Sequence, residues 1–257
     1  MDEEFYNKHG SEWWTEEESP FKLIRYMMNP LRFAYTIKHL IQRNVEYRGM
    51  KVLDIGCGGG FLTEEIAKFG MDAYGIDPSG PSLAAARRHA EAMNLDVEYL
   101  EGFGERLPFA DASFDMVFCL DVLEHVQDYR AIVKEVSRVL KPGGLFFFET
   151  INKTLLSFCI VILFMQEFPL TRLIPQGVHD WKYFIRPKKL KSSLKENGFV
   201  LRNIQGILPG LNLLYNLFLV RRKVMDKITF HDLCKLFNCH ESFYKGLCYI
   251  GFAELPS

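Results

Sequence analysis

The sequence predicts an α/β protein built on a mostly parallel sheet of seven strands, with helices on both faces. Two observations carry this prediction. Residues 52–60 have the pattern of a buried strand that ends in a glycine-rich turn and opens a helix. Strand and helix patterns then alternate as far as residue 150, which is typical of parallel strands covered on both sides.

The individual elements follow from local apolar patterns and from the signals at their ends. We expect strands at 51–56, 72–77, 96–101, 114–120, 144–150, 199–205 and 247–254, and helices at 60–69, 81–93, 128–140 and 187–197. The helix at 128–140 rests on apolar residues at helical spacing, which Pro142 and two glycines terminate. The helix at 187–197 begins at a proline and ends before Gly198.

The composition argues against some classes of function. The chain has 257 residues and a formal net charge of −1, so no overall positive field favours nucleic acid as a partner. Six cysteines in this length are too sparse for a disulfide framework, which predicts a reducing compartment. Residues 1–4 are acidic and lead into no apolar signal region, so we expect a cytoplasmic protein.

The glycine-rich turn reads Asp-x-Gly-x-Gly-x-Gly over residues 54–60. A dinucleotide fingerprint requires glycine at the position where this chain has Phe61. The negative charge of Asp54 suits a cationic amino-acid moiety better than a pyrophosphate. Asp77 ends the next strand, where an acid can accept both hydroxyls of a ribose. The turn and Asp77 therefore predict a nucleoside site at the tips of the first two strands.

The turn resembles motif I of the class I S-adenosylmethionine (SAM) methyltransferases, whose fold is Rossmann-like. Other segments narrow the resemblance to the ubiquinone-biosynthesis O-methyltransferase family. These are residues 11–14 (Ser-Glu-Trp-Trp), 29–32 (Asn-Pro-Leu-Arg), 121–126 (Asp-Val-Leu-Glu-His-Val), 140–144 (Leu-Lys-Pro-Gly-Gly), 150–152 (Thr-Ile-Asn), 177–180 (Gly-Val-His-Asp) and 184–187 (Phe-Ile-Arg-Pro). The resemblance covers roughly residues 5–205, and the stretch 206–246 looks longer than the family's usual ending.

The resemblance implies which residues contact SAM. The expected contacts are Arg32, Gly56, Asp77 and Leu120, together with Asp54 and Gly58 of the turn. A guanidinium such as that of Arg32 can grip the methionyl carboxylate with two hydrogen bonds. Adenine is expected to be held by backbone N–H groups such as that of Gly104, because Phe103 stands where many relatives have an acid.

On this basis the chain divides into four parts. We expect an N-terminal helical segment at 1–46 that covers the SAM site, followed by a SAM-binding core at 47–150. An apolar insertion or lid follows at 151–186. Residues 187–257 complete the sheet and contain the divergent insertion at 206–246.

Asp121, Glu124 and His125 follow the fourth strand, at the ligand edge of the sheet and on one face of a turn. Three roles are open for them. The first, which the resemblance implies, is to bind a divalent cation such as Mg²⁺ that acidifies a catechol. In the second, His125 acts alone as general base and Glu124 orients it. In the third, Glu124 and His125 cap the following helix and border the SAM pocket.

His179 follows a turn after the apolar segment. If that segment is a lid, His179 marks its return to the active site and either bonds or deprotonates the acceptor. The alternative is a buried histidine that is satisfied within the turn.

Residues 155–165 are almost all apolar, and apolar residues continue to position 174. The run is too short to cross a bilayer, which takes about 20 residues. It is therefore a core helix, a lid over an apolar substrate, or a peripheral contact with the inner face of a membrane. Its position at the ligand end of the sheet favours the lid or the membrane contact. A second apolar run at 207–220 precedes three basic residues, which suits anionic headgroups or a solvated helix end.

The leading hypothesis for function is an enzyme that uses SAM to O-methylate a phenolic or catechol hydroxyl. The resemblance implies a polyprenylated quinone precursor as the lipid-like aromatic substrate. The divergent stretch 206–246 motivates an alternative, which is O-, N- or C-methylation of another small apolar metabolite. A catalytically silent SAM-binding scaffold is disfavoured, because it has no physical need for Asp54, the glycines and Asp77.

Overall fold

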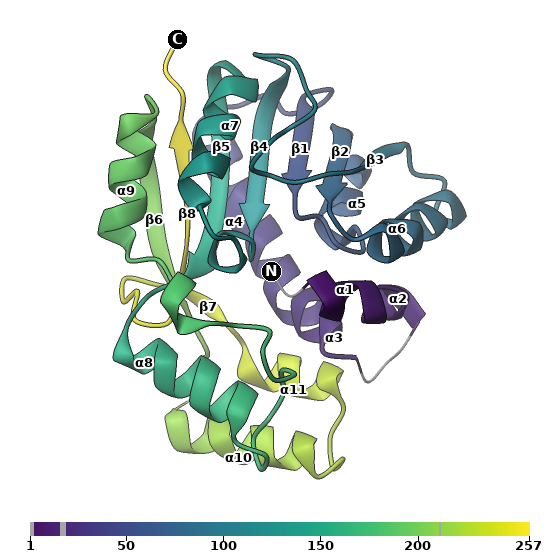
Figure 1. Ribbon diagram of the computed structural model, residues 1–257, viewed down its shortest axis with the longest axis vertical. Coiled ribbons are helices and arrows are strands. Elements are labelled where there is room, and N and C mark those ends of the chain that lie inside the picture. The colour runs from purple at the N-terminus through teal and green to yellow at the C-terminus, as the bar shows by residue number, and fades with distance from the viewer. Residues whose placement is uncertain (1–2, 16–18, 211) are drawn as a thin grey trace.

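One sheet of eight strands forms the frame of the protein (Figure 1). The computed structural model describes residues 3–15, 19–210 and 212–257. The strands are β1 (Lys51–Ile55), β2 (Asp72–Asp77), β3 (Val97–Glu101), β4 (Phe114–Leu120), β5 (Leu140–Ile151), β6 (Val200–Leu208), β7 (His240–Ser242) and β8 (Cys248–Glu254). Their order across the sheet is β3-β2-β1-β4-β5-β8-β6-β7.

The strand directions create one switch point in the sheet. Strands β1 to β5 pair in parallel, and β8 lies antiparallel between β5 and β6. The chain runs outward from β1 through β2 and β3 and then returns to β4 on the other side of β1. In open sheets of this kind, ligands bind beyond the carboxyl ends of the strands at such a reversal. The tips of β1 and β4 therefore position the site.

The prediction of a mostly parallel sheet is confirmed, but the count of seven strands is wrong by one. The seven predicted strands are all present, and β7 is the additional one. It pairs antiparallel with Gly206, Ile207 and Leu208 at the end of β6. Three residues within the divergent insertion are too short to show an alternating pattern in the sequence.

Helices cover both faces of the sheet. They are α4 (Asn29–Gln42), α5 (Phe61–Lys68), α6 (Gly80–Ala92), α7 (Tyr129–Val139) and α9 (Pro187–Glu196). Val52 packs in the cluster formed with α4 and α5, whereas its neighbour Leu53 packs in the cluster formed with α7 and α9. Both side chains are fully buried, as expected for a parallel strand covered on both faces. Helix α6 packs against β2 and β3.

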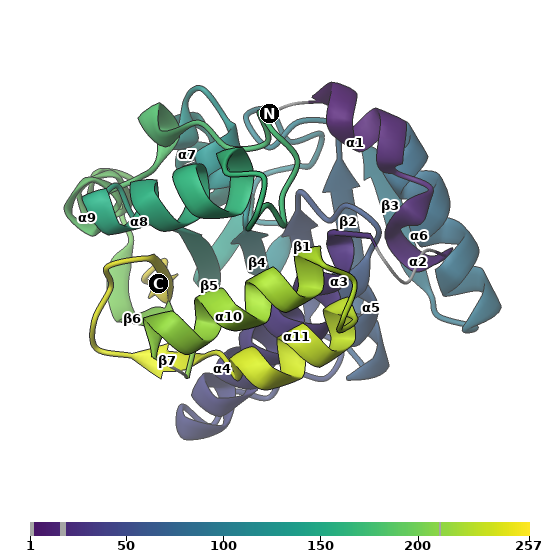
Figure 2. The same cartoon turned by 90° about the horizontal axis from the view of Figure 1, so that it is seen from below.

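The N-terminal segment crosses the ligand end of the sheet. It contains α1 (Glu3–His9), α2 (Glu12–Thr15), α3 (Phe21–Leu23) and η1 (Ile24–Met28), which continues directly into α4. Helices α1 and α2 lie against α6, as Figure 2 shows. The described part of the N-terminal segment is therefore mostly helical and lies against α6.

Two further helical units lie beyond the carboxyl ends of the parallel strands (Figure 1). The first is the α8–η3 helix, formed by α8 (Leu155–Ser157) and the wider π-helical turns of η3 (Phe158–Glu167). Thr154 and Ser157 form a capping box at its start. The second is the α10–α11 hairpin, formed by α10 (Leu213–Val224) and α11 (Phe230–Phe237) within the divergent insertion.

The apolar stretch at 155–165 is therefore a surface helix and not a core helix. Ser157, Val161 and Gln166 are its buried residues within 155–167. Leu155 is 77% exposed and Leu163 is 41% exposed. Across the described ranges, every helix is too short or too polar to cross a membrane.

Candidate active site

The glycine turn after β1 is shaped by close neighbours as well as by its own backbone. Gly58 has a φ of 52° and Gly60 a φ of 84°, both in the left-handed region that favours glycine. A Cβ on Gly58 would lie 2.5 Å from the ring of Trp13. A Cβ on Gly60 would lie 2.2 Å from the hydroxyl of Tyr99. The glycines therefore let the N-terminal segment and β3 press against the turn.

Two tryptophans fasten the N-terminal segment onto this turn. Trp13 donates a hydrogen bond from Nε1 to the Ser82 hydroxyl at 3.0 Å. Trp14 donates from Nε1 to the carbonyl of Gly59 at 2.7 Å and stacks on His89 with ring centroids 3.4 Å apart. Both tryptophans therefore pack the N-terminal segment onto the core, and Trp13 also lines the cavity beside the turn.

Asp77 lies at the tip of β2, where the sequence predicts the ribose contact. Its carboxylate accepts hydrogen bonds from the backbone N–H groups of Gly58 at 2.9 Å and Ser79 at 2.8 Å. The carboxylate is buried, and burial raises its pKa above the ordinary value. Each carboxylate oxygen has two lone pairs, so Asp77 keeps the capacity to accept ribose hydroxyls.

A small cavity of about 70 Å³ lies between the tips of β1, β2 and β4. Most of the predicted SAM contacts line it, namely Arg32, Asp54, Gly56, Gly58, Asp77 and Leu120. Gly104 does not line it, and a Cβ there would meet the Ile55 side chain at 2.8 Å. We call this space the nucleoside cavity.

The nucleoside cavity also has walls that the sequence analysis did not assign. They include Tyr6, Asn29, Phe61, Leu62 and Val122. Asn29 donates from Nδ2 to the carbonyl of Phe61 at 3.1 Å and so ties the start of α4 to the start of α5. The sequence did contain an indication of the role of Asn29, because Asn29 belongs to the Asn-Pro-Leu-Arg segment that carries the family resemblance.

Asp54 lies under the turn and lines the nucleoside cavity. It accepts a hydrogen bond from the Thr63 hydroxyl at 2.7 Å. Burial raises its pKa to about 7, and the hydrogen bond from Thr63 opposes that rise. A cation bound in the cavity would favour the ionised form of Asp54, so the site is electrostatically suited to a positively charged ligand.

Arg32 holds two carboxylates at the centre of the site. Its guanidinium donates to Glu149 on β5 through Nε and to Asp121 after β4 through a terminal nitrogen. Arg32 is 4% exposed, and its pKa is raised by the two carboxylates despite the opposing effect of burial. The other terminal nitrogen of the Arg32 guanidinium has no hydrogen-bond acceptor among the described residues. That nitrogen is available for a ligand carboxylate.

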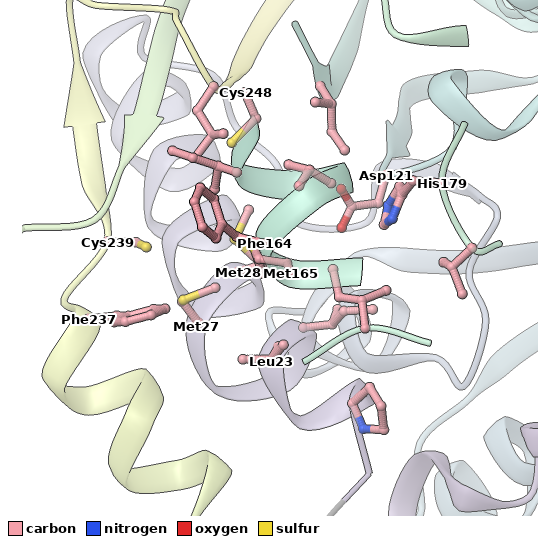
Figure 3. A pocket seen from close by; sticks show the side chains of 18 of the residues that line it. Leu23, Met27, Met28, Asp121, Phe164, Met165, His179, Phe237, Cys239 and Cys248 are labelled. Carbon is pink, nitrogen blue, oxygen red and sulfur yellow. The ribbon is translucent and has the colours of Figure 1, made fainter. Parts of the chain in front are cut away.

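A larger cavity of about 270 Å³ adjoins the nucleoside cavity. Its walls are almost entirely apolar and come from the N-terminal segment, the α8–η3 helix, the loop at 171–179, the α10–α11 hairpin and the strand ends. Asp121 and His179 lie at one end of it, and Phe237 and Cys239 lie at the opposite end (Figure 3). The two cavities share Tyr6, Ile24, Asp121 and His125 as wall residues. We call the larger space the apolar cavity.

Two imidazoles mark the boundary between the cavities. The ring centroids of His125 and His179 are 4.8 Å apart. Burial lowers the pKa of His125 to about 3 and the pKa of His179 to about 4, so both rings are neutral near pH 7. The buried Nδ1 of His179 has no hydrogen-bond partner in the part of the chain that the structure describes. The structure therefore brings the two predicted histidines together.

The amide of Gln166 fixes the backbone of His179. Gln166 accepts from the His179 N–H at 2.8 Å through Oε1 and donates to the His179 carbonyl at 3.1 Å through Nε2. Gln166 is 3% exposed and lies near the end of η3. The position of His179 therefore depends on the α8–η3 helix.

Glu124 lies behind the site and lines neither cavity. It accepts from the Thr150 hydroxyl at 2.9 Å through Oε2. Burial and then the charge of Asp121 raise the pKa of Glu124 to about 8. Its carboxyl group is therefore mostly protonated at neutral pH and acts as an internal hydrogen-bonding group.

The predicted metal ligands do not converge. Asp121 is engaged by Arg32 and Glu124 by Thr150. Within residues 3–15, 19–210 and 212–257, no group of three histidine, cysteine, aspartate or glutamate side chains is arranged to hold a metal ion. These residues as placed do not fit a divalent cation, and we derive no chemical step through one.

The fold, the glycine turn and the paired cavities define a SAM-dependent methyltransferase. A family model for a methyltransferase domain matches residues 53–148. The chain is 37% identical over 205 residues to the ubiquinone biosynthesis O-methyltransferase of Methylococcus capsulatus, an alignment that covers 79% of this chain and 83% of that protein. It is also 37% identical to the enzyme of the same name from Alkalilimnicola ehrlichii, covering 89% and 87% of the two chains. The chain belongs to the ubiquinone biosynthesis O-methyltransferase family.

A solved structure supports the fold independently. The magnesium protoporphyrin IX methyltransferase from Synechocystis PCC 6803, solved with bound SAH, superimposes with a TM-score of 0.64. The match covers 99% of this chain and 98% of that chain at 18% sequence identity. The Rossmann-like fold of a class I methyltransferase is thereby confirmed.

The ribose contact is tested with Asp77→Ala. We expect this change to weaken SAM binding by more than about tenfold, because it removes a charged acceptor at the cavity wall. Isothermal titration calorimetry measures the two dissociation constants. Asp72→Ala is the matched control, since Asp72 is exposed at the start of the same strand. Equal affinities of wild type and Asp77→Ala would refute the ribose contact.

The protonation of buried Glu124 is tested by comparing the stability of wild type and Glu124→Gln at several pH values. In wild type, the folded carboxyl group keeps its proton up to about pH 8, whereas its ordinary pKa is 4.5. Wild type therefore loses stability relative to Glu124→Gln as pH rises from about 4.5 to 8, by about 1.4 kcal/mol for each pH unit at most. Chemical denaturation at several pH values measures this difference.

Glu98→Gln, an exposed carboxylate on β3, is the control for that series. A constant difference in unfolding free energy between wild type and Glu124→Gln over this pH range would contradict the assignment of a buried, protonated Glu124.

Proposed function

We propose that this methyltransferase transfers the methyl group of SAM to a phenolic hydroxyl of a catechol that carries a polyprenyl chain. One observation carries the proposal, which is that a polar nucleoside cavity and an apolar cavity meet at Asp121 and His125. The names of the curated relatives agree with it, because those proteins are ubiquinone biosynthesis O-methyltransferases.

The nucleoside cavity fits SAM by its own chemistry. Asp77 offers acceptor capacity for a ribose, and Arg32 offers a terminal nitrogen to a carboxylate. Asp54, Asp77 and Asp121 line the same space and favour a cationic ligand. When bound, SAM supplies a methyl group that is bonded to a sulfonium sulfur.

The residues at the junction deprotonate and align the acceptor. A catechol hydroxyl has a pKa near that of tyrosine, about 10, so the hydroxyl needs a base near pH 7. His179 is neutral, lines the apolar cavity, and has an Nδ1 that is not engaged by any described residue. Asp121 stabilises the positive charge that a protonated His179 or His125 acquires. We assign His179 as the general base, with His125 beside it at the boundary.

The assignment of His179 is tested with His179→Ala. We expect the turnover of a catechol to fall by roughly 10²-fold or more, the usual contribution of a general base. SAM affinity should stay unchanged, because His179 does not line the nucleoside cavity. Stopped-time assays with labelled SAM measure turnover, and His231→Ala on α11, where His231 is exposed, is the control.

A more acidic acceptor shows whether His179 acts as a base or only as a structural residue. A nitrocatechol ionises without help, so His179→Ala should lose much less activity on it than on catechol. Equal losses on both acceptors would show that His179 is only structural. Dialysis of wild type against EDTA tests the alternative that a divalent cation activates the acceptor. If activity is lost and Mg²⁺ alone restores it, a cation held by Asp121, Glu124 and His125 activates the acceptor in place of His179.

We also propose that residues 155–174 contact a membrane surface at its periphery. Leu163, Phe164, Phe168 and Leu170 are between 38% and 60% exposed beside the apolar cavity. An interfacial helix places such side chains among the acyl chains, which suits a substrate that resides in a bilayer. The phenol end of the substrate then reaches His179 without crossing water.

The membrane contact is tested with the double variant Phe168→Glu and Leu170→Glu. We expect it to lose flotation with vesicles of phosphatidylcholine and phosphatidylglycerol, because charged side chains resist insertion. SAM affinity should be kept. Val200→Glu is the control, since Val200 is 40% exposed at the start of β6, the opposite end of the sheet. Unchanged flotation of the double variant would refute the contact.

A further inference from the structure

The α10–α11 hairpin is a packed wall of the apolar cavity. Leu219, Leu233 and Phe237 are buried in one cluster with Leu23 of the N-terminal segment and Leu173, which follows the α8–η3 helix. The hairpin thus joins two other walls of the cavity through apolar contacts. A wall that is packed in this way can discriminate between ligands by shape, because its side chains have little room to move.

The far end of the apolar cavity differs from the end that holds the chemistry. Asp121 and His179 lie at one end, whereas Phe237 and Cys239 lie at the other, with Met27 and Phe164 between the ends (Figure 3). The wall residues of α10 are Asn216, Leu217 and Val220. The part of the cavity away from the histidines is therefore suited to an apolar group that has no need of hydrogen bonds.

Two residues that line the apolar cavity, one on η3 and one on α10, are also partly exposed. Phe164 lines the cavity and is 38% exposed, and Leu217 on α10 lines it while only half-buried. On the outer side of the same two helices, Leu163 and Phe218 are 41% and 52% exposed. A passage between these two helices would therefore have an apolar rim on both sides.

The volume of the cavity sets a limit on what it encloses. At about 270 Å³ it is slightly smaller than a typical small-molecule site. It has room for an aromatic ring and the start of a chain, so the remainder of a long chain has to leave through an opening. A passage between Phe164 and Leu217, which both line the cavity, would offer the apolar side chains that such a chain prefers.

We propose that α10 of the divergent insertion is a specificity element that binds the apolar chain of the acceptor. The chain passes between the α8–η3 helix and α10 and contacts Leu217 on its way out of the cavity. This inference rests on the proposed function and goes beyond it by naming the segment that selects the chain. Because the contacts are apolar and not directional, α10 selects for the presence and bulk of a chain.

The proposal is tested by comparing a bare acceptor with a chain-bearing one. The probes are 4-methylcatechol and the same ring with a farnesyl chain in place of the methyl group. Each buried CH₂ contributes roughly fourfold to affinity, so wild type should prefer the farnesyl catechol strongly. Leu217→Trp places a large ring in the opening and should lower the ratio of the two kcat/KM values by about tenfold or more, mainly through the KM of the farnesyl catechol.

Leu214→Trp is the matched control. It makes the same substitution one turn earlier on α10, where Leu214 is 80% exposed and does not line the cavity. It should leave the ratio within about twofold of wild type, as surface substitutions usually do. An equal fall of the ratio in both tryptophan variants, or no fall in Leu217→Trp, would overturn the proposal.

A binding assay separates this inference from the proposed function. Equilibrium dialysis measures the affinity for farnesyl catechol without turnover, and Leu217→Ala provides a second variant if Leu217→Trp unfolds. Weaker binding in Leu217→Ala supports α10 as the chain-binding element, whether or not wild type methylates either catechol. Failure of wild type to methylate both catechols would refute the proposed function alone. Unchanged binding in Leu217→Ala would overturn the inference while leaving the proposed function intact.

Discussion

The ion triad of Arg32, Glu149 and Asp121 is the interaction on which the site depends, and Arg32 and Glu149 are buried while Asp121 is half-buried. It links α4, β5 and the turn after β4, which are far apart in the sequence. Asp121 adopts a φ of 57°, a left-handed conformation that aspartate tolerates better than most residues. Each of the three side chains lines at least one cavity. Loss of Arg32 would leave two uncompensated carboxylates, which is more costly than loss of an exposed pair.

The triad also sets the electrostatics of the site. Arg32 compensates only part of the acidic charge, because Asp54 and Asp77 also line the nucleoside cavity. Burial raises the pKa of Asp54 and of Glu149 to about 7 each, and the charge of a neighbouring carboxylate adds to each rise. Such a site attracts a cation and becomes less favourable once the ligand has lost its positive charge. Methyl transfer removes that charge, so the same electrostatics that favour the substrate also favour release of the product.

The fold and the nucleoside cavity could be predicted because their signals are local. The strand pattern, the glycine turn and Asp77 lie within one short stretch, and each has a direct physical cause. The apolar cavity could not be predicted in the same way, because its walls come from many segments that are far apart in the sequence. The insertion at 206–246 was recognised as a departure from the family that contains an apolar run, but apolar residues on α10 do not reveal what they pack against. The role of Glu124 was obscured for a related reason, because the direction of its side chain toward Thr150 is set by tertiary packing.

One consequence follows from the wall that the two cavities share. Tyr6 and Ile24 of the N-terminal segment contribute to both cavities, and Trp13 and Trp14 fasten that segment to the glycine turn. A ligand in either cavity that orders this segment reduces the entropic cost of ordering it for the other. Donor and acceptor are then thermodynamically linked, and by reciprocity each raises the affinity of the other by the same factor. An enzyme with this linkage holds its donor most firmly when an acceptor is already in place.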